Sequence, residues 1–230
     1  MNFGPSSHCA RVPALPAALL AFEGQPVEHA AFFYLNEESL IYTLRDVTVA
    51  ALRSDGAAVI MAVGPHLRAL ARLLTDRGAD LPALRTQGRY AEIDVEEVLS
   101  TCMEGSTLNL QKLGSQLGGA IAAARQEPNS KTAPLFVLGE TVALLWARRD
   151  FRNLRALEEL GDNLGPAVAT LCAYPIEEFA EPGTERTYLE ICAMHSTVIP
   201  PEGYPTNEME RRLREATAQA YGQAAGPRDL

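Results

Sequence analysis

The chain has 230 residues, 47% hydrophobic and 21% charged, with a formal net charge of -9. This hydrophobic fraction is ordinary for a globular protein and excludes disorder along the whole chain. No apolar run reaches the roughly 18 residues that a membrane-spanning helix needs, and the acidic excess argues against a protein that binds nucleic acid directly.

Apolar runs alternate with helical periodicity along most of the sequence. The run from His29 to Tyr34 is typical of a buried strand, and Asn36 after it is the expected N-cap of a helix. In chain order, the sequence predicts strand 29–34, a helix ending at 54–56, strand 57–63, helix 64–78, strand 89–93, helices 95–102 and 105–125, strand 134–138, helices 141–148 and 151–160, strand 168–174, and helices 188–195 and 208–221.

This alternation defines the expected fold class. Strands that are apolar on both faces, separated by helices, indicate a mostly parallel sheet covered on both sides. We therefore predict an α/β protein, a three-layer α/β/α sandwich, with one domain over residues 28–200. Residues 1–27 are expected to form a flexible leader and 201–230 a C-terminal linker and helix.

In an open parallel sheet, ligands bind beyond the carboxyl ends of the strands. Tyr34, Glu140 and Tyr174 stand at or just after the ends of three predicted strands, so we interpret them as pocket residues. Glu140 has a second interpretation, because a Glu that begins a helix also interacts favourably with the helix dipole.

Cys192 and His195 are three residues apart on a predicted helix, and so would share a face. A hydrogen-bonded His195 in a pocket is the favoured interpretation. A metal site with His29, Glu140 or Cys172 is an alternative, and a Cys192 nucleophile with His195 as its base is a weaker one. We assign no metal and no catalytic residue.

Arg89 follows a predicted turn and is a secondary candidate, together with Cys172 and Cys192. A guanidinium beside a crevice recognises carboxylate or phosphate groups. A salt bridge from Arg89 to Asp94 or Glu92 explains it equally well.

Six short motifs occur in an order that resembles the MEDS domain, the methanogen/methylotroph, DcmR sensory domain. They are His29-x-x-x-Phe33-Tyr34, Gly88-Arg89, Gly139-Glu140, Leu157-Glu158, Cys172-Ala-Tyr-Pro175 and Ile191-Cys-x-x-His195. The resemblance covers about residues 28–200. It implies a signal-input module for small hydrocarbon derivatives, occurring alone or fused to histidine kinases or DNA-binding output domains.

The same stretch is similar to the KaiC-like branch of RecA-fold ATPases, but it departs from them at the phosphate-handling positions. Where a phosphate loop would carry Gly and Lys, the chain has Leu35-Asn36-Glu37-Glu38-Ser39. Carboxylates there repel phosphate, whereas a phosphate loop needs glycines and a lysine. The resemblance therefore implies a RecA-like scaffold without a functional phosphate loop.

Together, these observations predict a non-catalytic cytoplasmic sensor that binds a small, partly apolar molecule at the strand ends and relays to a transcriptional regulator or a histidine kinase. The predicted ligand-binding residues are His29, Tyr34, Glu140, Tyr174 and His195. No cofactor, no direct nucleic-acid contact and no membrane contact are expected. The alternatives are a protein-interaction module without a ligand and a divergent metal- or nucleotide-dependent hydrolase.

Overall fold

A six-stranded parallel sheet forms the centre of the molecule. The computed structural model describes residues 29–124, 135–164, 168–177, 184–199 and 201. The strands of the sheet are β1 (His29–Tyr34), β2 (Ala57–Ala62), β3 (Tyr90–Asp94), β6 (Leu135–Gly139), β7 (Val168–Pro175) and β8 (Thr197–Ile199). They lie in the order β3-β2-β6-β7-β1-β8, and every neighbouring pair is parallel.

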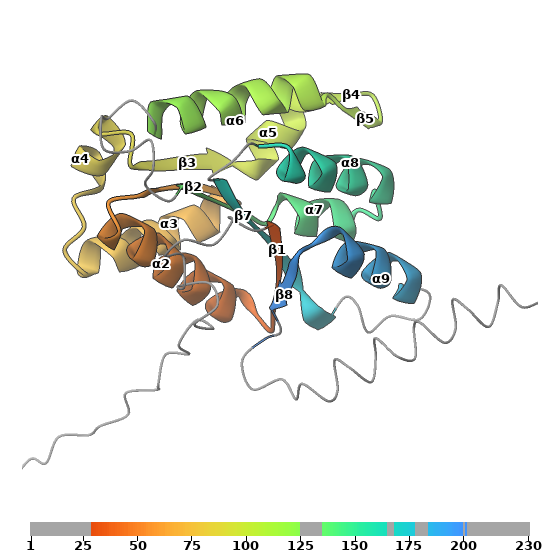
Figure 1. The fold of residues 1–230 in the computed structure, drawn as a ribbon, viewed down its shortest axis with the longest axis horizontal. Helices are drawn as coiled ribbons and strands as arrows, with labels where there is room; N and C mark the ends of the chain where they lie inside the picture. The colour runs from red at the N-terminus through yellow and green to blue at the C-terminus, as the bar shows by residue number, and fades with distance from the viewer. Residues whose placement is uncertain (1–28, 125–134, 165–167, 178–183, 200, 202–230) are drawn as a thin grey trace, which may run out of the picture.

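Helices cover both faces of this sheet (Figure 1). They are α2 (Glu37–Arg53), α3 (Gly64–Asp76), α4 (Leu81–Thr86), α5 (Val95–Cys102), α6 (Leu110–Ala124), α7 (Thr141–Ala147), α8 (Phe151–Asp162) and α9 (Glu185–Met194). One apolar core packs α2, α3 and α4 on the sheet, and a second packs α5 to α9 on its other face. The predicted three-layer α/β/α sandwich is therefore confirmed.

Local chemistry explains where several helices begin. The Asn36 side chain accepts a hydrogen bond from the backbone N–H of Ser39, and the Ser39 hydroxyl accepts one from the backbone N–H of Asn36. These two bonds form a capping box at the start of α2, and Asn36 is the N-cap that the sequence predicted. Asp94 accepts hydrogen bonds from two backbone N–H groups at the start of α5. Both caps satisfy backbone donors that would otherwise lack partners.

The structure differs from the sequence prediction in three places. Residues expected to begin a helix at 105 instead form a short hairpin, β4 (Met103–Glu104) and β5 (Thr107–Leu108), with Gly105 at a positive φ of 62° in its turn. Helix α4 and edge strand β8 were not predicted, and both are short. The predicted leader and helix 208–221 lie outside the described residues.

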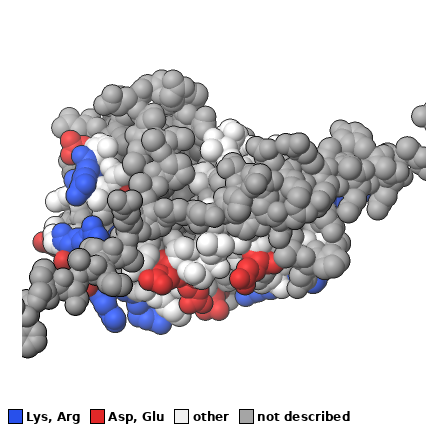
Figure 2. Space-filling view, turned by 90° about the horizontal axis from the view of Figure 1, so that it is seen from below, with Lys and Arg blue, Asp and Glu red and all other residues white. Residues whose placement is uncertain are grey.

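One face of the molecule shows both acidic and basic side chains. Seen from below, acidic and basic side chains lie near one another on the part of this face that is described (Figure 2). Among the described residues, no helix is long and apolar enough to cross a membrane.

Candidate functional site

The candidate site lies between the sheet and helices α8 and α9. Side chains alternate between the two faces of a strand, so His29 lies on the same face as Ala31 and Phe33. In β7, Cys172 and Tyr174 share that face, and the register pairs His29 with Thr170. The parallel pairing of β1 with β7 therefore brings one histidine and one thiol close together under α8.

Helix α8 contributes two acids to this site. Its apolar stripe, which includes Leu154 and Leu157, packs on the sheet. Glu158 is one turn after Leu154, and its side chain is completely buried, whereas the side chain of Asp162 one turn further on is 48% exposed. A buried carboxylate is costly unless it is paired, so its neighbours determine whether it is tolerated.

Glu158 is the centre of the cluster. Its Oε2 atom lies 3.0 Å from Nε2 of His29 and 3.3 Å from Nε2 of His195, and it accepts a hydrogen bond from Sγ of Cys172 at 3.1 Å. Its Oε1 atom accepts a hydrogen bond from the hydroxyl of Tyr174. The carboxylate is thus surrounded by four polar side chains from β1, β7 and the end of α9.

Outer hydrogen bonds orient both imidazoles. Nδ1 of His29 donates to Oδ1 of Asp162 at 2.6 Å, and Nδ1 of His195 donates to the carbonyl oxygen of Ile191 at 2.7 Å. Both histidines therefore direct Nε2 toward Glu158. Nε2 of His195 is buried and makes no hydrogen bond, although it lies within ion-pair distance of Glu158.

The electrostatics of the cluster follow from burial and these contacts. Burial alone would raise the pKa of Glu158, but the imidazoles of His195 and His29 hold that pKa well below its usual range. Burial lowers the pKa of His29, yet the hydrogen bonds and charges of Glu158 and Asp162 outweigh it and raise that pKa. Burial and the charge of Glu158 raise the pKa values of Cys172 and Tyr174.

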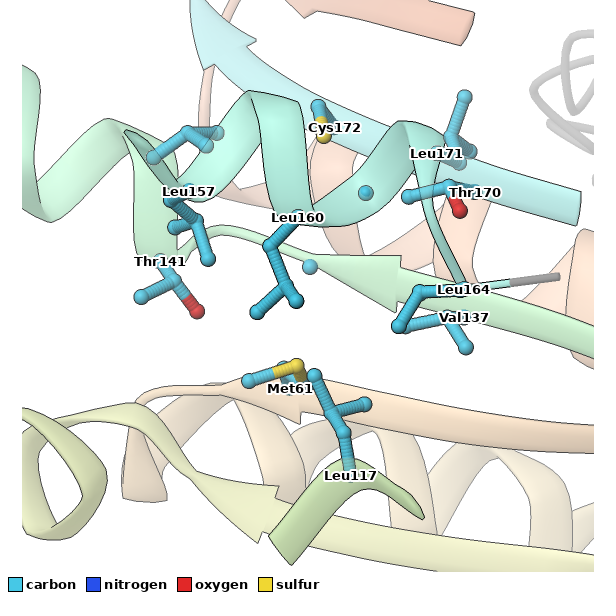
Figure 3. Close-up of a pocket in the computed structure, with 13 residues that line it drawn as sticks. Met61, Leu117, Val137, Thr141, Leu157, Leu160, Leu164, Thr170, Leu171 and Cys172 are labelled. Carbon is cyan, nitrogen blue, oxygen red and sulfur yellow. The ribbon is translucent and has the colours of Figure 1, made fainter. Parts of the chain in front are cut away.

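An apolar cavity adjoins the cluster. About 40 Å³ of it can hold the centre of a water-sized molecule, within about 400 Å³ of space between atoms that includes open solvent. Leu157 and Leu160 of α8 face Met61 of β2 and Leu117 of α6 across it (Figure 3). Three residues that line the cavity also lie beside His29: Cys172, Gly161 and Thr170. Thr141 lines it too, and its Oγ1 atom is buried without a hydrogen-bond partner.

The structure brings together three of the five predicted ligand-binding residues, His29, Tyr174 and His195, with the secondary candidate Cys172 as a fourth. Tyr34 lies on the opposite face of the sheet, in the core beneath α2, because it is an odd number of residues from His29. The five residues therefore do not line one crevice at the carboxyl ends of the strands, since His29 begins β1.

Glu140 belongs to a different cluster, at the carboxyl end of β6. Its Oε1 atom accepts a hydrogen bond from the backbone N–H of Val63 at 2.6 Å and from Nδ1 of His66 at 2.8 Å. Val63 is the N-cap of α3 and has no side chain that caps the helix. Glu140 thus fastens the end of β6 to the start of α3.

Two secondary candidates also lie outside the cluster. Arg89 donates to the carbonyl oxygens of Leu52 at 2.5 Å and Gly56 at 3.2 Å, so it holds the turn before β2, and neither predicted salt bridge forms. Cys192 does not share a helix face with His195, because α9 ends at Met194 and His195 has extended backbone angles. Burial raises the pKa of Cys192 to about 11.

Glu158 and Asp162 were not among the predicted site residues. The sequence did contain a signal for Glu158: it stands four residues after Leu154, on the face of α8 that the apolar stripe predicts to be buried. An acid at a core position requires a partner, and this reasoning would have selected Glu158 without a structure.

Comparison with known protein families agrees with the resemblance seen in the sequence. The family described as the methanogen/methylotroph, DcmR sensory domain (MEDS) matches residues 28–196. The chain belongs to the MEDS family. This match contains every residue of the Glu158 cluster and assigns the MEDS domain a sensory role. No curated protein and no solved structure matches significantly, so the similarity to RecA-like ATPases stays a prediction.

Proposed function

We propose that this MEDS domain is a signal-input module that binds a small, partly apolar molecule in the cavity beneath α8. The observation that carries the proposal is the contact between an apolar cavity and a buried polar cluster, with Cys172 belonging to both. Ligand pockets combine apolar walls with a few polar groups that fix orientation. The unpaired hydroxyl of Thr141 supplies another such group.

Occupancy of this cavity would act on two helices. Leu157 and Leu160 line it, while Glu158, between them on α8, lies against His195 at the end of α9. A ligand that favours one position of α8 therefore also favours one arrangement of α9. We expect this shift to reach a histidine kinase or the output domain of a transcriptional regulator.

The sensory family favours a non-enzymatic role. The three cysteines in the described part of the chain, Cys102, Cys172 and Cys192, are free thiols. Free thiols suit a reducing compartment, so we expect the protein to act in the cytoplasm.

Thermal unfolding in the presence of short-chain alcohols, ketones and chlorinated hydrocarbons tests the proposal. A ligand at 100 times its Kd should stabilise the fold by about 2.7 kcal/mol. Leu160→Trp fills the cavity and should abolish this gain, whereas Leu35→Trp, at an exposed side chain, should retain it. A compound that stabilises both variants equally, or a panel without any effect, would favour an interaction module without a ligand.

A further inference from the structure

We propose that His29, Glu158, Cys172 and His195 form a binding site for one divalent transition-metal ion of the Zn²⁺ class. Each residue offers one donor atom, and the four donor atoms lie within 4.8 Å of one another. All four residues are more than nine-tenths buried. The proposal goes beyond the ligand-binding role and does not rest on it, because metal uptake is measured without a ligand.

Four of the donor separations lie close to those of a tetrahedral site. Donor atoms bonded to Zn²⁺ at about 2.0 to 2.3 Å lie about 3.3 to 3.8 Å from one another. Nε2 of His29 lies 3.3 Å from Sγ of Cys172, and Nε2 of His195 lies 3.3 Å from Oε2 of Glu158. The two shortest separations, 3.0 and 3.1 Å, need to open by a few tenths of an ångström, and the widest, up to 4.8 Å, needs to close by about 1 Å as the side chains gather around an ion.

The imidazoles are already oriented as metal ligands usually are. A ligating histidine almost always donates its other ring N–H to a carboxylate or a backbone carbonyl. His29 does so to Asp162, and His195 does so to the carbonyl of Ile191. Nε2 of His195 is then left buried and without a hydrogen bond. An ion at the centre would be coordinated by this atom, which otherwise makes the 3.3 Å ion-pair contact with Glu158.

Charge and donor softness select the class of ion. A thiolate and a carboxylate together balance a divalent cation, so the buried centre would be neutral with both histidines uncharged. Nitrogen and sulfur donors suit Zn²⁺ and its neighbours among the transition metals. Mg²⁺ and Ca²⁺ require six or more ligands, nearly all oxygen, which this cluster does not offer.

The first test uses the full chain, stripped of metal by a chelator and then titrated with Zn²⁺ or Co²⁺. We expect one equivalent of either ion to bind, and Co²⁺ to give the visible absorption of a tetrahedral centre with a near-ultraviolet thiolate-to-cobalt band. Mg²⁺ at the same concentration should not compete. A folded chain that takes up neither Zn²⁺ nor Co²⁺, or that binds Co²⁺ without a tetrahedral spectrum, would overturn the proposal.

Matched variants locate the site. Cys172→Ser should remove the thiolate-to-cobalt band, while Cys192→Ser, outside the cluster, should retain it. The reverse result would place the metal elsewhere and overturn the assignment.

Asp162→Asn provides a variant that does not depend on a buried substitution, because its side chain is 48% exposed. Asparagine keeps an acceptor for the Nδ1–H of His29 but removes the carboxylate charge, and mutation of such an outer partner of a ligating histidine lowers metal affinity about 10- to 100-fold. Asp55→Asn, at a side chain that is 92% exposed and remote from the cluster, is the control. Equal affinities in the two variants would contradict a role of His29 as a ligand.

Discussion

Gly161 of α8 lies directly against the imidazole of His29. A Cβ atom built on Gly161 would be 3.0 Å from Nε2 and 3.2 Å from Cε1 of that ring, and 3.5 Å from Cγ2 of Thr170. The ring cannot give way easily, because Asp162, Glu158 and Cys172 all contact it. The absence of a side chain at Gly161 is therefore what lets α8 approach β1 and place Glu158 beside His29.

Gly161→Ala should accordingly destabilise the protein. Overpacking a filled site costs about 1 to 3 kcal/mol, which exceeds the gain of up to about 1 kcal/mol from better helix propensity. Gly118→Ala is the matched control, because Gly118 lies on the exposed face of α6 and no atom is within 4 Å of an added Cβ. This substitution should stabilise the protein. Urea unfolding of both variants gives the comparison, and a stabilised Gly161→Ala would show that the contact is not tight.

Glu158→Gln tests whether the buried charge holds the cluster together. The change keeps the shape of the side chain but removes the charge that His29 and His195 face. Breaking one partner of a buried ion pair costs on the order of 3 kcal/mol. Glu159→Gln, on the exposed side of the same helix, should change the free energy of unfolding little. Both are measured by urea unfolding with a chelator present, and equal stabilities would mean that the charge is dispensable.

The contact between His66 and Glu140, at the carboxyl ends of the strands, should make the stability of the protein depend on pH. The hydrogen bond and charge of Glu140, with a smaller contribution from Glu37, raise the pKa of His66 against the effect of burial. Since the folded state binds the proton more tightly, this stabilisation is complete below the unfolded pKa of about 6.5 and is lost as the pH rises through the higher folded pKa.

The variant His66→Gln should therefore lose more stability relative to the wild type at acidic pH than at alkaline pH. Unfolding free energies of both proteins across this range give the difference. Glu37→Gln is the control, because the carboxylate of Glu37 is 82% exposed and 3.8 Å from Nε2 of His66, so it should have only a small effect. A difference that does not change with pH would exclude a raised pKa of His66.

Most of the helices and strands could be predicted, because the patterns that specify them depend on residues close together in the sequence. The apolar run His29–Tyr34 forms a strand by its own composition, and the caps Asn36 and Asp94 accept hydrogen bonds from backbone groups a few residues away. Edge strand β8 has only three residues, and its pairing with β1 depends on where α9 docks. Short segments carry too little periodicity to be separated from a loop.

The site was predicted only in part, for the same reason. His29, Tyr174 and His195 were selected by their positions in the chain, but the group that joins them, Glu158, reaches them through the docking of α8. Glu140 was selected because it was predicted to follow a strand, and in the structure it does follow β6. Its partner His66 comes from the neighbouring strand-to-helix junction, a pairing that only the sheet order determines.

Thr141 gives the most direct test of how the cavity is used. Its Oγ1 atom is buried without a hydrogen-bond partner, and replacing it by a methyl group of similar size removes this unsatisfied group. Thr141→Val should therefore raise the free energy of unfolding by about 1 kcal/mol or more. Thr48→Val is the control, because the Thr48 hydroxyl donates to the carbonyl oxygen of Leu44 at 2.6 Å, and losing that bond should not stabilise.

The same Thr141→Val variant separates stability from binding. If the hydroxyl orients a ligand, the variant is more stable yet binds a stabilising compound about 10-fold more weakly, which corresponds to one lost hydrogen bond of about 1.4 kcal/mol. Thermal unfolding with and without the compound measures both quantities on one sample. Unchanged affinity together with higher stability would mean that Thr141 only lines the cavity, and that the polar part of the ligand is recognised at the Cys172 end.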